Sequence, residues 1–213
     1  MSDSGQPHPL PKNLRKTGWG AASVREGAKI MSMNYAQLDQ ETRRLMLDEI
    51  QTDEREGKLY ISPRLSQTGV AEYPQLQRHA AESGTDDSLA ASLKQNGRLN
   101  ATEQRAKPSG GYSIVRVPVT AAETLAEGEF NRFYVRALCR RQMSGGGRLV
   151  VHRAKQVQNP RPESEALIGT NPNAQTLLED LRTNIGVETA LGVPKRPNSG
   201  LSVQIVKVLV TKN

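Results

Sequence analysis

The chain has 213 residues, a formal net charge of +7 and few aromatic residues (4%), which suits one domain with extensions, or two small domains, around an aliphatic core. No run approaches the roughly 20 apolar residues of a membrane span, and the N-terminus lacks the apolar stretch of a secretory signal. We therefore expect a protein that is not secreted and makes no membrane contact. The single cysteine allows no intramolecular disulfide and indicates a reducing compartment.

Residues 1–33 are predicted to form an extended basic arm outside the core. The segment has three prolines close together, no hydrophobic periodicity and a net charge of +3. Trp19, the only tryptophan of the chain, lies in it between two glycines. A tryptophan in a flexible basic segment is typical of an anchor to a partner or to the domain itself. Two alternatives are a disordered tail, or a domain that truly begins at Met31 or Met33.

Residues 34–100 are predicted to form a helical region. An amphipathic helix is expected over 39–56, with Asp39 as its N-cap and Gly57 as its end. Two further helices are expected over 67–83 and 86–95, with Gly84 and Gly97 as the residues that terminate them.

Residues 101–213 are predicted to form an α/β core domain. The polar stretch 100–111 indicates a loop or hinge, and strands are expected over 112–119, 148–157 and 201–210. One helix is expected to start at Asn171-Pro172. The predicted fold class is therefore α+β, with a small mixed sheet of about three to four strands packed by several helices, and an extended N-terminal arm.

The central element is a helix expected over 120–145. Thr120 and Glu123 have the spacing of a capping box, and both phenylalanines of the chain lie on one apolar stripe. Gly128 interrupts the pattern and costs about 1 kcal/mol relative to alanine. We expect a kink or restart of the helix there, or another backbone packed against that point.

Basic residues are concentrated on this helix and the strand after it. From Glu129 to Arg161 the sequence has eight basic residues and one acidic residue, which accounts for the whole net charge of the chain. Such a row can pair with carboxylates elsewhere in the fold, bind an anionic partner, or handle phosphate in an active site. We favour an outside partner, and the predicted nucleic-acid or partner-binding residues are Arg132, Arg136, Arg140, Arg141, Arg148, Arg153, Lys155 and Trp19.

No catalytic residue, cofactor or metal is assigned from the sequence. One cysteine and three scattered histidines cannot supply a structural zinc site. The glycine turn 144–147 lacks the lysine of a phosphate-binding P-loop and follows a helix. A nuclease would need carboxylates beside Lys155, and only Glu163 and Glu165 follow it, after a proline break. Cys139 is expected to be a structural thiol.

Three segments, LAEGEFNRFYVRALCRR, HRAKQVQNPRPESEALIG and PNSGLSV, resemble those of a family of uncharacterised proteins from bacteria and their phages. The resemblance runs from about Tyr35 to Gln204 and leaves out the arm. It implies no catalytic residues. It does imply a phage or prophage gene product, in which setting a small basic protein with an arm is typical of a virion or assembly component.

Two functions are therefore expected. The first is a non-enzymatic structural or assembly protein, such as a capsid-associated virion component, whose partners are other protein subunits. The second is a nucleic-acid-binding or nuclease-like protein that uses the same arginines on DNA phosphates. The expected location is the virion or the cytoplasm.

Overall fold

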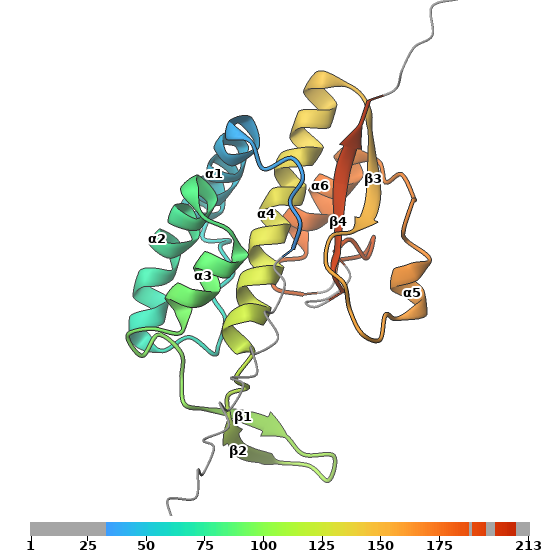
Figure 1. Cartoon of the computed structure of the whole chain (residues 1–213). Helices are drawn as coiled ribbons and strands as arrows, with labels where there is room; N and C mark the ends of the chain where they lie inside the picture. Colours follow the sequence, from blue (N-terminus) through green and yellow to red (C-terminus); the bar gives the residue numbers. More distant parts are fainter. Residues whose placement is uncertain (1–32, 188, 195–198, 208–213) are drawn as a thin grey trace, which may run out of the picture. The chain divides into compact units, whose positions relative to one another are not determined.

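The computed structural model describes residues 33–187, 189–194 and 199–207, and within them it confirms the α+β class (Figure 1). Trp19 and the rest of the predicted arm up to residue 32 lie outside the described residues, as do the last positions of the predicted strand 201–210. The helices are α1 (Gln40–Arg55), α2 (Gln67–Ser83), α3 (Asp86–Leu93), α4 (Ala121–Gly145), α5 (Pro162–Glu165) and α6 (Ala174–Thr183). The strands are β1 (Thr102–Ala106), β2 (Tyr112–Arg116), β3 (Arg148–Arg153) and β4 (Leu201–Val206).

The described strands form two separate antiparallel pairs and not one mixed sheet. β1 pairs with β2, and β3 pairs with β4. β1 occupies the polar stretch that the sequence indicated as a loop. Its residues are almost all exposed, so it carries no apolar alternation, and its hydrogen bonds to β2 define it.

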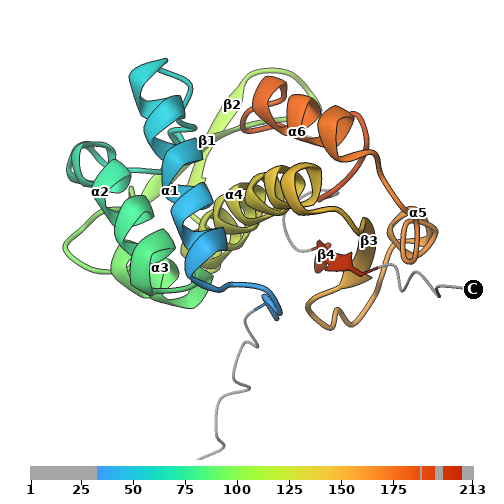
Figure 2. The same cartoon turned by 90° about the horizontal axis from the view of Figure 1, so that it is seen from above.

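Helix α4 is the centre of the hydrophobic core. In the view of Figure 2, α1 and α3 lie on one side of α4, and α6, β3 and β4 lie on the other. Phe130, Phe133 and Tyr134 are buried, but so are residues on every other face of the helix as far as Cys139. A helix that is buried all round differs from the predicted single stripe, because elements pack against it from both sides.

The predicted segments 34–100 and 101–213 share one core. The cluster of buried apolar side chains is continuous from Leu45 in α1 to Val203 in β4. Within the described ranges, no helix is both long enough and apolar enough to cross a membrane.

Local signals at the helix starts were correct in part. The Asp39 carboxylate accepts a hydrogen bond from the Thr42 amide at 3.0 Å, which confirms the predicted cap of α1. The predicted capping box of α4 is wrong, because the Thr120 side chain makes no cap bond. Helix α6 begins two residues later than predicted, where the Asn173 side chain accepts from the Thr176 amide at 3.0 Å.

Candidate interaction surfaces

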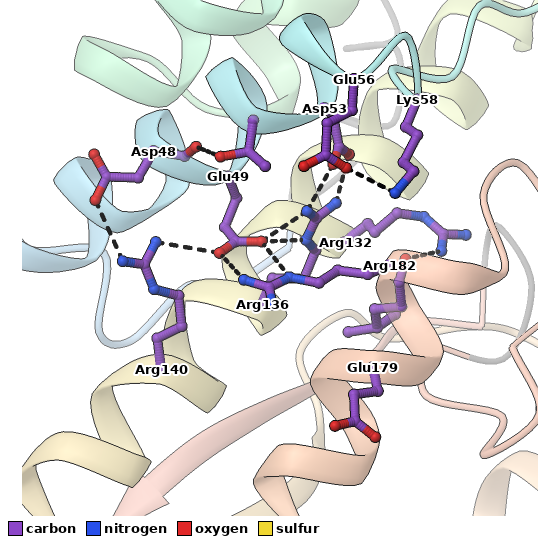
Figure 3. Close-up of polar contacts among 12 residues, drawn as sticks. Asp48, Glu49, Asp53, Glu56, Lys58, Arg132, Arg136, Arg140, Glu179 and Arg182 are labelled. Carbon is purple, nitrogen blue, oxygen red and sulfur yellow. Dashed lines mark hydrogen bonds and ion pairs between the residues drawn. The ribbon is translucent and has the colours of Figure 1, made fainter.

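The predicted row of arginines exists on α4, but it faces the interior. Figure 3 shows Arg132, Arg136 and Arg140 directed towards carboxylates and carbonyls of neighbouring elements. Arg136 is fully buried, and Arg132 is only 7% exposed. Neither side chain can reach a partner in solution. The prediction of an outward basic face on α4 is therefore corrected for these two residues.

Arg136 is held by two acids of α1. Its Nη1 and Nη2 donate to the two oxygens of Asp53 at 2.6 and 2.8 Å, and its Nε donates to Glu49 at 2.8 Å. Burial alone would lower the pKa of Arg136, but the hydrogen bonds and charge of Asp53, with those of Glu49, outweigh it and raise the pKa. The guanidinium also lies 5.0 Å from the centre of the Phe133 ring.

Glu49 is the shared acceptor of this network. Besides Arg136 it accepts from Arg140 at 3.1 Å and from Arg182 of α6 at 2.5 and 3.0 Å. Burial tends to raise the pKa of Glu49, yet the bonds from Arg182 and Arg136 dominate and lower it. One buried carboxylate thus links α1, α4 and α6, which is a structural role.

Arg132 caps the C-terminal end of α6. Its guanidinium donates to the carbonyls of Leu181 at 3.3 Å, Asn184 at 2.9 Å and Val187 at 3.2 Å. The last carbonyls of a helix have no partner within the helix, and a cation there is favourable. Arg132 therefore stabilises the end of α6 and the loop after it.

The other predicted binding residues divide into paired and exposed ones. Arg141 pairs with Asp39 at 2.8 Å, Arg153 pairs with Glu165, and Lys155 pairs with Glu127. Arg148 is exposed, and no ion pair holds it within the described part of the chain. Positive charge that is concentrated along the sequence is thus largely matched in space by carboxylates from distant segments.

The carboxylates that pair with the arginines of α4 also show a regular spacing in the sequence. Glu49 and Asp53 stand four residues apart on α1, the same spacing as the arginines of α4. Two helices with complementary rows of charge at that spacing can pair along their contact. The matching spacing of the two rows is compatible with this network, but only the packing of α1 against α4 decides that the rows meet.

Glu163 and Glu165, the carboxylates that a nuclease site at Lys155 would need, do not pair with that lysine. Lys155 and Glu165 pair with different partners, and Glu163 is exposed. Within the described residues, no group of three or more His, Cys, Asp or Glu side chains is placed to hold a metal ion. Cys139 is buried, and burial raises its pKa to about 12. Such a thiol is almost entirely protonated near neutral pH and is a poor nucleophile.

Helix α4 is continuous across Gly128. Gly128 is one of the residues that line a small cavity. The cavity has a volume of about 160 Å³ and is also lined by Tyr60, Glu129 and Gly186. Burial raises the pKa of Glu129, and the nearby Arg132, with Nε 3.5 Å from the carboxylate, partly offsets this. The helix therefore does not restart at Gly128, and the kink and the close backbone contact stay predictions.

The surface that stands out from the core is the β1–β2 hairpin. It extends beyond the start of α4 in Figure 1, and one of its links to the rest of the fold is the pair between Glu103 and Arg64, with Nε 2.5 Å from the carboxylate. Tyr112 is 71% exposed and Ile114 is 75% exposed. A two-stranded hairpin alone is marginally stable in water, and apolar groups on its face favour a further contact.

Hydrogen bonds at both ends of the hairpin fix which backbone groups point outward. The Lys107 amide donates to the Gly111 carbonyl at 3.0 Å, and the Val117 amide donates to the Ala101 carbonyl at 3.1 Å. Bonded and non-bonded pairs alternate along an antiparallel ladder. The residues whose amide and carbonyl groups face the two free edges are therefore Thr102, Gln104, Ala106, Tyr112, Ile114 and Arg116.

Comparison of the chain with models of protein families, with curated proteins and with solved structures finds no match.

Proposed function

We propose that this protein is a non-enzymatic structural protein that joins a protein assembly, and that it contacts neighbouring subunits through the β1–β2 hairpin. The resemblance to bacterial and phage proteins makes a phage particle the assembly to test first. The proposal concerns other protein subunits as partners.

The observation that carries it is the exposure of apolar side chains on a hairpin that the core does not cover. Tyr112 and Ile114 lie on the same face, because they are two residues apart on β2. Fully burying a side chain of this size stabilises by about 1.5–3 kcal/mol. Two such residues support a contact that is weak for one copy and strong when several contacts form together.

The internal pairing of the charged residues supports a structural role over a nucleic-acid-binding one. Binding to DNA phosphates needs cationic side chains that are free to neutralise them and so displace the counterions of the DNA. Arg132 and Arg136 are buried, while Arg140 and Arg141 are held by acids of α1 or its N-cap. The alternative function would have to rely on other basic residues, such as Arg148.

The test compares two variants of the full chain in the organism that encodes it. Tyr112→Ser with Ile114→Ser removes the apolar face of the hairpin. Val70→Ser with Val187→Ser removes two exposed apolar side chains from other parts of the structure and is the matched control. The measurement is the fraction of the chain that sediments with large particles. We expect the hairpin variant to lose most of this fraction and the control to keep it.

Equal sedimentation of the hairpin variant and the wild-type chain would refute the proposed function. Retention on DNA, measured over a series of salt concentrations, provides the second measurement. A steep loss of binding with salt would favour the nucleic-acid alternative.

A further inference from the structure

We infer that the hairpin's partner is a second copy of this chain. In the inferred contact, β2 pairs with β2 of the second copy in antiparallel fashion about a twofold axis at Ile114, which gives a four-stranded sheet. The inference rests on the proposed function, because it names the partner of the same surface.

The first support is that β2 is an unpaired edge. The amides and carbonyls of Tyr112, Ile114 and Arg116 point away from β1, and no other described strand pairs with them. Such an edge is a template for another strand. The side chains of the same three residues are exposed, so both the backbone and the face are open to a partner.

The second support is the difference between the two edges of the hairpin. Proteins protect edge strands from unwanted pairing with charged side chains. The β1 edge carries Glu103 and Arg105, and Lys107 follows it. The β2 edge reads Tyr-Ser-Ile-Val from Tyr112 and has no charge before Arg116. β2 therefore lacks the protection that β1 has.

The third support is that β2 is complementary to itself in this register. A twofold axis at Ile114 places Ile114 beside Ile114 of the second copy. It also places the Arg116 guanidinium beside the Tyr112 ring of the second copy, an attractive pairing of cation and aromatic face. No like charges face each other across the axis. Arg116 forms no ion pair with any other residue that the structure describes, so its guanidinium is available for this contact. The three outward-facing residues would form three pairs that exchange backbone hydrogen bonds.

The size of this contact limits its strength. Five residues of β2 span roughly 17 Å, and pairing along them buries less than the roughly 1,200 Å² of a stable interface. We therefore expect a dissociation constant of about 100 μM, which is weak alone and effective where many copies meet.

The main experiment reverses charge at the axis. In the full chain, I114K would place two lysines face to face in the homodimer, and I114E would place two glutamates face to face. Each variant alone should weaken self-association at least about tenfold in sedimentation equilibrium. An equimolar mixture should recover association to within about threefold of wild type, since a lysine then faces a glutamate. Q104K and Q104E, at the middle of β1, are the matched control and should change little.

A second measurement captures the contact covalently. Paired residues about such an axis have Cα atoms about 5.5 Å apart, a distance that suits a disulfide. Cys139 is buried and is the only native cysteine, so it does not compete. Under mild oxidation, Ile114→Cys should form a disulfide-linked dimer, and Gln104→Cys should form at least about tenfold less.

Three results would overturn the inference. The wild-type chain could stay monomeric to about 1 mM, the I114K and I114E mixture could fail to recover association, or the Gln104 variants could show the pattern instead. The proposed function would still stand if one of these results occurred while the double variant Tyr112→Ser with Ile114→Ser was lost from particles. The partner of the hairpin would then be a different protein. Failure of the proposed function is a separate result, in which that variant still sediments with particles.

Discussion

Replacing Arg136 by methionine tests whether the buried network holds α1 against α4. The substitution keeps a long apolar side chain but removes the guanidinium. Asp53 then loses both of its hydrogen bonds, and it has no other side-chain partner within the described residues. Glu49 keeps Arg140 and Arg182. The cost of Arg136→Met therefore arises mainly at Asp53.

The expected magnitude follows from leaving one carboxylate buried without a partner. Breaking a buried ion pair by removing one member costs about 3–5 kcal/mol. Whole domains are stable by about 5–15 kcal/mol, so the variant should be close to unfolding at moderate temperature. At roughly 2–4 °C per kcal/mol for a domain of this size, Tm should fall by about 6–20 °C. Urea unfolding and thermal unfolding at pH 7 measure both quantities.

A second variant and a control make this result specific. Arg136→Met combined with Asp53→Leu removes both members of the pair and should recover at least about 2 kcal/mol, because no buried charge is then left unpaired. Arg141→Met breaks a partly exposed pair with Asp39 and should cost no more than about 1 kcal/mol. A cost below about 1 kcal/mol for Arg136→Met would refute the reasoning.

Two further changes have defined outcomes. Burial raises the pKa of Asp86 from 3.8 to about 6, so the folded state binds a proton more tightly and wild-type stability falls as pH rises between these values. Asp86→Asn should therefore gain about 1–3 kcal/mol at pH 7 and nothing near pH 4 in urea unfolding; a gain that does not vary with pH would contradict this. Gly186→Ala should cost more than Gly97→Ala by at least about 1 kcal/mol in the same assay. Both glycines have positive φ, but an added Cβ would lie 2.2 Å from the Tyr60 ring only at Gly186. Equal costs would show that Tyr60 moves aside.

Helices could be predicted from the sequence because their signals are local. The Asp39 cap and the glycine stops act over a few residues, and the apolar spacing of α1 and α2 repeats within each helix. β1 could not be predicted, because a polar, exposed strand has no periodicity and depends on its pairing with β2.

The sequence by itself determined that α4 exists, that it carries a row of arginines, and that the chain is of α+β type. Tertiary structure alone decided which way that row faces. Arg136 and its acceptors Glu49 and Asp53 are 87 and 83 residues apart in the chain. Whether a cation meets solvent or a carboxylate depends on how α1 packs against α4, and spacing along one helix contains no information about its neighbour. The free edge of β2 was decided in the same way, because an edge is defined only by which strands lie beside it.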